Sequence, residues 1–102
     1  MRKIVAPILL LFLANSACST VYPVKYYVAA REAVDAAKEV ESARWAPGLW
    51  YKAEEAYRKA KHQYEEQNYK EAVELFQVAQ AYAEKAENSS RYQRQKTGEE
   101  AP

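Results

Sequence analysis

The sequence predicts an all-α fold, either a small three-helix antiparallel bundle or an extended helical hairpin. The chain is rich in alanine, glutamate, lysine and tyrosine and has only two glycines in 102 residues, a balance typical of helical proteins. Apolar residues recur at spacings of three and four over residues 24–88, as they do on one face of a helix. Breaks at residues 45–48 and 66–68 divide this stretch into three segments.

Residues 1–17 have the layout of a signal peptide. Arg2 and Lys3 precede an apolar run over residues 4–13, and small residues then lead to Cys18. This order of basic, apolar and small residues is that of a secretory signal. The apolar run is too short to cross a bilayer, which needs about 20 residues. We therefore expect residues 1–17 to be removed from the mature protein.

The stretch around the cysteine resembles bacterial lipoprotein precursors. Ser16 and Ala17 match the small residues that precede the acylated cysteine in that family. The resemblance implies cleavage before Cys18, acylation of its thiol with palmitate-type chains, and a lipidated tether over residues 18–23. Ser19 implies sorting to the outer membrane, on its periplasmic face. Asn15 departs from the aliphatic residue usual in the family. Ordinary signal-peptidase cleavage after Ser16, which releases a soluble protein with a free thiol, is the alternative.

The first helix is expected over residues 24–45. Pro23 suits a helix start, and Pro47 disfavours helical geometry in the residue before it, so the helix should end near Trp45. Val34 widens the apolar face. That face consists of Tyr26, Ala30, Ala33, Ala37, Val40 and Arg44.

The second helix is expected over residues 47–66, with Pro47 in its first turn. Residues 66–68 form a tight turn, and Asn68 caps a third helix over residues 69–88. The second helix has a face of alternating aromatic and small residues: Trp50, Ala53, Tyr57, Ala60 and Tyr64. The third has a main face of Tyr69, Ala72, Phe76, Ala79, Ala83 and Ala86, and a flanking row of Leu75, Val78 and Tyr82. The apolar face then stops, so residues 89–102 are expected to be a polar, disordered tail.

Two longer stretches carry a second resemblance. "AAREAVDAAKEVESARWAPGLWYKAEEAYRKA" and "NYKEAVELFQVAQAYAEKA" resemble the bacterial lipoprotein segments labelled domain of unknown function 4398. This implies an Ala-rich helical domain over residues 24–88 behind the lipidated cysteine, with no catalytic residues to carry over. Members often precede a peptidoglycan-binding domain. Within the second stretch, Ala72, Phe76 and Ala79 also resemble the second helix of a tetratricopeptide repeat.

Several classes of function lack the residues they need. The chain has one cysteine and one histidine, His62, so an internal disulfide and a clustered metal site are not expected. No Ser–His–acid set or phosphate-binding glycine loop can be assembled, which predicts neither an enzyme nor a cofactor. The formal charge is +1, and −1 once Arg2 and Lys3 are removed with the signal peptide. That balance argues against nucleic acid as a partner.

The small size of the domain predicts a protein partner or self-association. Below about 70–80 residues a single core rarely supplies more than about 3–5 kcal/mol. Aromatic residues are enriched where proteins meet, although hairpin packing alone also accounts for them here. The candidate interaction patch is Trp45, Pro47, Leu49, Trp50, Tyr51 and Tyr82. We therefore expect a helical adaptor or structural subunit of a cell-envelope assembly. Binding of peptidoglycan or another envelope polymer is the alternative.

Overall fold

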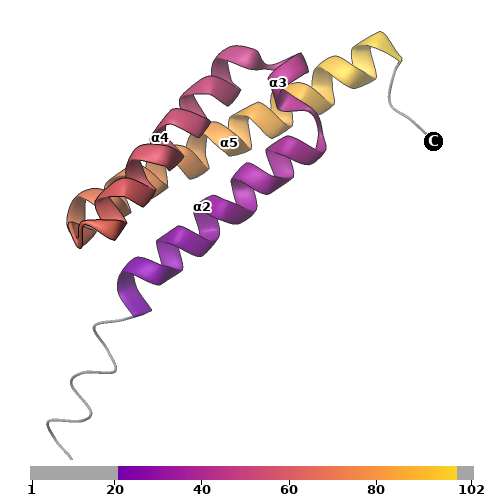
Figure 1. Ribbon diagram of the computed structural model, residues 1–102. Helices are drawn as coiled ribbons and strands as arrows, with labels where there is room; N and C mark the ends of the chain where they lie inside the picture. The colour runs from indigo at the N-terminus through magenta and orange to yellow at the C-terminus, as the bar shows by residue number, and fades with distance from the viewer. Residues whose placement is uncertain (1–20, 99–102) are drawn as a thin grey trace, which may run out of the picture.

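The computed structural model describes residues 21–98, which form four helices (Figure 1). They are α2 (Val21–Glu39), the short α3 (Ser42–Trp45), α4 (Pro47–Glu65) and α5 (Tyr69–Thr97). The long α5 packs against both α4 and α2, whereas α2 and α4 contact each other much less. α2 and α5 run in the same direction and α4 runs opposite to both (Figure 1). The all-α prediction is confirmed, in the form of an up-down-up three-helix bundle.

α2 begins at Val21, three residues earlier than the sequence predicts. Pro23 lies in its first turn and is buried. Proline is tolerated there because the first backbone N–H groups of a helix have no intrahelical partner. The expected tether over residues 18–23 is therefore wrong for residues 21–23, which belong to the helix.

The predicted helix over residues 24–45 is interrupted at Glu41. This residue has φ 58° and ψ 47°, the left-handed conformation. The backbone N–H of Glu41 donates to the carbonyl of Lys38, and the carbonyl of Glu41 accepts from the backbone N–H groups of Arg44 and Trp45 in α3. Because the break shifts the helical phase, Arg44 is exposed and does not continue the buried face.

The start of α4 at Pro47 and the start of α5 at Tyr69 agree with the sequence prediction. Asn68 stands at the N-cap position of α5, but its side chain makes no capping bond there. Its Nδ2 instead donates to Oε1 of Gln63 at 2.8 Å. The turn is completed by Gln67 in the left-handed conformation, with φ 64°.

The core is made mainly of alanine. Phe76 is its one large apolar side chain with no exposed surface, and it lies against the rings of Tyr27, Tyr57 and Tyr64. The half of the core near the α4–α5 turn contains Ala30, Ala56, Ala60, Ala72, Phe76 and Ala79. The half near α3 contains Val34, Ala37, Ala46, Ala53, Ala83 and Ala86.

α5 continues to Thr97, so the prediction of a disordered tail from residue 89 is wrong for residues 89–97. Ser90 is fully buried and its Oγ donates to Oγ of Ser42, also fully buried, at 3.0 Å. This bond joins α5 to α3 across 48 residues of chain. A buried serine pair carries no apolar signal, so the apolar pattern in the sequence ends before the packed face of α5 does.

Replacing Ser90 by alanine should lower the free energy of unfolding by about 1–3 kcal/mol, because it leaves the buried Ser42 hydroxyl without this partner. The double variant Ser42→Ala/Ser90→Ala should recover part of that loss, since neither polar group then remains. Urea unfolding followed by circular dichroism, analysed as a double-mutant cycle, measures both changes. Additive losses in the double variant would contradict a coupled pair.

Candidate functional site

Residues 21–98 contain no group of three or more histidine, cysteine or acidic residues placed to hold a metal ion. His62, the one histidine, is exposed in the last turn of α4. Within the same range, none of the helices combines the length and apolar character that crossing a bilayer requires. The candidate sites described below are the predicted interaction patch and two grooves on the surface.

The structure divides the predicted interaction patch. Leu49, Trp50 and Tyr82 are partly buried and pack against the half of the core near α3. Tyr51 is 64% exposed and Pro47 is also exposed. Three of the six predicted residues thus contribute to packing between helices, while Tyr51 and Pro47 face outward.

Trp45, the remaining residue of the patch, is partly buried beside the bend. The guanidinium carbon of Arg44 lies 4.7 Å from the centre of its indole ring. Its Nε1 is buried and has no hydrogen-bond partner among the described residues. An indole N–H that is buried without a partner is a cost to stability, so the position of Trp45 is set by packing and by the stacked arginine.

A shallow groove of about 220 Å³ runs between α4 and α5. Val78, one of its lining residues, is 42% exposed. Nζ of Lys52 and Nζ of Lys85 lie 5.5 and 5.6 Å from the ring centre of Tyr82, at cation–π range. The residues lining the groove are Lys52, Glu55, Ala56, Lys59, Leu75, Val78 and Tyr82. This α4–α5 groove combines apolar side chains with Lys52 and the ion-paired Lys59 and Glu55, and it contains the flanking row predicted from the sequence.

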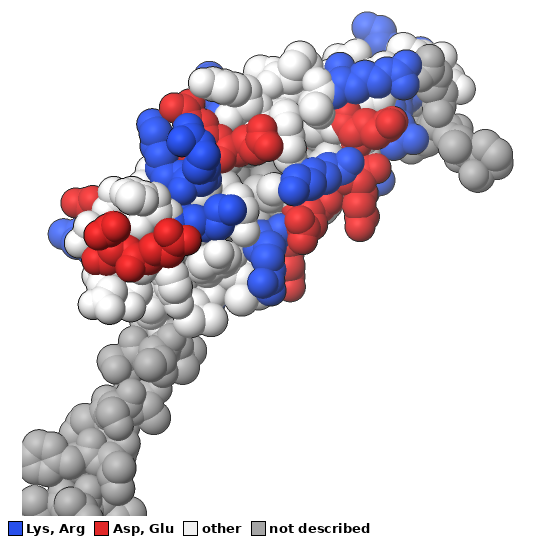
Figure 2. All heavy atoms as spheres, viewed as in Figure 1, with Lys and Arg blue, Asp and Glu red and all other residues white. Residues whose placement is uncertain are grey.

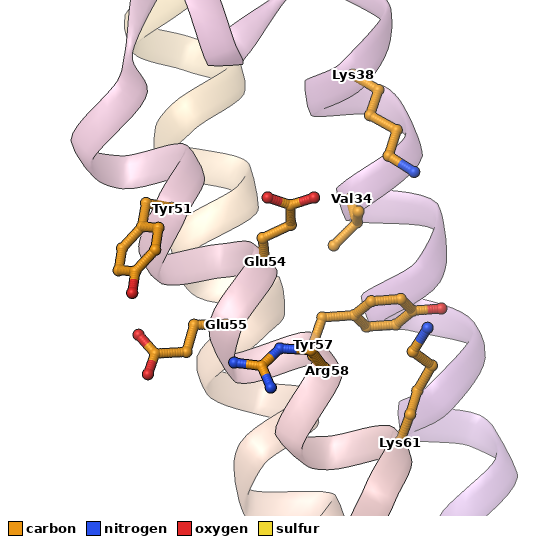
Figure 3. Close-up of a pocket in the computed structure, with 8 residues that line it drawn as sticks. All are labelled: Val34, Lys38, Tyr51, Glu54, Glu55, Tyr57, Arg58 and Lys61. Atoms are coloured by element: carbon orange, nitrogen blue, oxygen red, sulfur yellow. The ribbon is translucent and has the colours of Figure 1, made fainter.

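A larger groove of about 350 Å³ opens where α2 and α4 diverge (Figure 3). The ring of Tyr57 reaches toward α2, and Nζ of Lys61 lies 4.7 Å from its centre. Tyr51 and Glu55 point away from α2 (Figure 3). The lining residues are Val34, Lys38, Tyr51, Glu54, Glu55, Tyr57, Arg58 and Lys61. Sequence reasoning missed this groove, although Glu54, Tyr57 and Lys61 share the spacing of one helix face.

Charges of both signs are mixed over the face seen in Figure 2. Lys59 Nζ and Glu55 Oε1 form an ion pair at 3.1 Å, and Arg91 and Glu87 form another at 3.2 Å. Burial raises the pKa of the Tyr57 hydroxyl above its usual 10.0, and the neighbouring Tyr27 and Asp35 add to the rise. Tyr57 is therefore a packed, neutral phenol rather than an activated group.

The raised pKa of Tyr57 predicts a loss of stability in alkali. Below pH 10.0 the phenol is neutral in the folded and unfolded states; above it, the unfolded state releases the proton first and is favoured. The stability contributed by neutral Tyr57 is thus lost as the pH rises from 10.0 through the higher folded-state pKa. Tyr57→Phe should show a smaller loss over this range than the parent. Urea unfolding of both proteins at pH 9 and above measures the difference; identical losses would contradict the prediction.

Cys18, the predicted lipidation site, lies outside the described residues. Comparison with models of protein families gives no match, and neither the curated proteins nor the solved structures contain a significant one. The resemblances to bacterial lipoproteins and to domain of unknown function 4398 therefore stay predictions from the sequence.

Proposed function

We propose that this protein is a lipoprotein held through Cys18 on the periplasmic face of the bacterial outer membrane, and that its helical bundle is an adaptor or structural subunit of a cell-envelope assembly. The observation that carries the proposal is the order of a basic pair, an apolar run, small residues and a single cysteine. Each buried methylene of an acyl chain contributes about 0.8 kcal/mol. Several chains on Cys18 would therefore hold the bundle firmly at the membrane.

Mass spectrometry of the mature N-terminus tests the anchor. An acylated Cys18 is the expected first residue, and the Cys18→Ala variant should lose acylation and membrane association. Ser19→Ala is the matched control, because it leaves the cysteine intact and should remain in the membrane fraction. An unmodified peptide that begins at Ala17 would refute the anchor and support cleavage after Ser16.

The adaptor role is supported by the α4–α5 groove. The apolar surface of Leu75, Val78 and Tyr82 runs along α5, and Ala56 of α4 lines the same groove, a form that suits an amphipathic helix laid in a groove. Lys52 lines the groove, and Lys85 lies beside the ring of its Tyr82, so a partner helix with acidic residues beside its apolar stripe is favoured. A second copy of the chain and a different envelope protein are the two sources of such a helix.

Site-specific photocrosslinking in intact cells tests this role. A photoreactive amino acid in place of Val78 should give an adduct of discrete mass. The same group at Gln77 is the matched control, because Gln77 is also exposed and lies about 100° away around α5. A mass of twice the monomer identifies self-association. Recovery of uncrosslinked monomer alone, or equal adducts from both positions, would count against the groove as the docking surface.

The second candidate function is binding of peptidoglycan or another envelope polymer in the groove between α2 and α4. Tyr51 lines the edge of this groove, turned away from α2 (Figure 3), and is 64% exposed, so its ring is available to stack on a sugar bound at that edge. Charged groups of both signs beside it suit a polymer with amino and carboxyl groups. Purified sacculi should retain the full-length mature protein and retain Tyr51→Ala less well. No retention of the parent would eliminate this candidate.

A further inference from the structure

Tyrosines gather at the end of the bundle where α2 begins. The rings of Tyr22 and Tyr26 in α2 are 5.5 Å apart at their centres, and those of Tyr64 and Tyr69, across the α4–α5 turn, are 5.4 Å apart. The ring centre of Tyr27 in α2 lies 5.1 Å from that of Tyr64 near the end of α4. The first turn of α2 and the α4–α5 turn lie at the same end of the molecule (Figure 1). Five of the nine tyrosines in the chain thus belong to one end.

This tyrosine-rich end also exposes apolar surface. Tyr22 is 56% exposed, Val24 43% and Tyr69 41%. Uncharged side chains cover the surface where α2 begins, with acidic side chains nearby (Figure 2). Tyr69 is the important member, because it is far from Cys18 in sequence and reaches this end only through the fold.

Tyrosine is suited to the interface between lipid and water. Its ring is apolar and its hydroxyl is polar, and tyrosines are enriched at both surfaces of membranes for this reason. Cys18 precedes the start of α2 by three residues, and such a length of chain spans about 10 Å at most. A cysteine held in a bilayer would therefore bring this end of the bundle to the level of the headgroups.

We propose that the end of the bundle formed by Tyr22, Val24, Tyr26 and Tyr69 inserts into the polar interface of the bilayer that anchors Cys18. This inference rests on the proposed lipid anchor and adds a second contact with the membrane, made by the folded domain. The bundle then stands on the membrane, and the 29-residue α5 extends about 40 Å away from it at 1.5 Å per residue.

The charges at this end of the bundle indicate which type of bilayer surface it would contact. Lys25 and Lys70 are exposed there, but so are Glu65, Glu66 and Glu71. Because the acidic residues outnumber the basic ones, an anionic surface gains no attraction from this end. A zwitterionic bilayer surface is therefore the partner, and the contact is expected to be shallow and insensitive to salt.

Spin labels on the full-length acylated protein test the orientation. Acylation consumes the thiol of Cys18, the sole cysteine of the chain, so one introduced cysteine is the only labelling site. The test sites are Tyr69→Cys and Val24→Cys. The controls are Tyr92→Cys and Tyr51→Cys, which replace tyrosines that are 62% and 64% exposed elsewhere on the bundle. Each labelled protein is reconstituted into phosphatidylcholine vesicles, and helical content is checked by circular dichroism.

Accessibility to lipid-soluble oxygen, relative to a water-soluble nickel complex, should be several-fold higher at positions 69 and 24 than at 92 and 51. Raising the salt should leave the ratio unchanged. A label at position 69 that is as accessible to nickel as the one at 92 would overturn the inference. Equal lipid exposure at all four positions would also overturn it, because the bundle would then lie flat.

Flotation of the same vesicles on a density gradient distinguishes failure of the bundle to contact the bilayer from failure of the lipid anchor. Protein that floats with the vesicles but keeps position 69 in water retains the anchor and refutes only the seating of the bundle. Protein that does not float refutes the anchor, and the inference that rests on it falls too. If the Tyr69→Cys variant loses helical content, Lys70→Cys, exposed at the next position, takes its place with the same expected result.

Discussion

Replacing Phe76 by alanine is expected to unfold most of the protein at 25 °C. Phe76 has no exposed surface, and its ring lies 4.7 Å from that of Tyr27 in α2 and 6.1 Å from that of Tyr57 in α4. Truncating a buried phenylalanine costs about 3–5 kcal/mol. That is comparable with the whole stability that a core of this size supplies, about 3–5 kcal/mol. The helical circular dichroism signal at 25 °C should therefore fall sharply.

Val78→Ala is the matched control, because Val78 belongs to the same helix but is 42% exposed. Changes at such surface positions usually stay within about 0.5 kcal/mol. Thermal unfolding of the two variants and the parent gives the comparison. A Phe76→Ala midpoint within about 5 °C of the parent, a shift that corresponds to about 1 kcal/mol in a domain of this size, would show that the three helices do not depend on this ring.

The parts of the fold that the sequence predicts correctly are those marked by helical spacing of apolar residues and by proline. The face of α5 recurs at three and four residues, and Ala72, Phe76 and Ala79 are all buried as expected. Pro47 places the start of α4 correctly, because its fixed φ suits a first turn and disfavours helix in the residue before it. These signals are local, so they can be read without the rest of the chain.

The parts that the sequence did not predict depend on contacts between distant residues. Glu41 adopts a left-handed conformation that is most common for glycine and asparagine, and no residue of the stretch "EVES" marks such a break. Ser90 is buried because Ser42 meets it. Both errors concern α3, a four-residue helix whose place is set by tertiary packing.

Of the candidate sites, one follows from helical spacing in the sequence and the other does not. The row of Leu75, Val78 and Tyr82 follows from helical spacing and does line a groove. The patch around the bend rests on its high content of aromatic residues, and content does not distinguish residues on the buried face of α4 from exposed ones. Trp50 packs against the core, whereas Tyr51, the next residue, is exposed. Helical spacing separates the two, because Trp50 shares a face with Ala53 and Tyr57 and Tyr51 does not.

Enlarging a buried alanine should destabilise the protein even though it adds apolar surface. Ala79 of α5 has no exposed area and belongs to a cluster with Ala30 of α2 and Ala56 of α4. Because buried alanines from three helices meet here, we expect three further heavy atoms to fit only if a helix moves. Inserting methylenes into a packed core typically costs about 1–3 kcal/mol, so Ala79→Leu should lower the urea midpoint.

Ala81→Leu is the matched control on the same helix. Ala81 is exposed, and alanine and leucine are both strong helix formers, so this change should leave stability nearly unaltered. If Ala79→Leu instead raised the midpoint, the alanine cluster would be loosely packed and the added side chain would fill a void. In that case, close approach of the helices would not explain how a core made mainly of alanine holds three helices together. The expected loss would support close packing, because only a core without free volume turns the three added carbons of leucine into a cost.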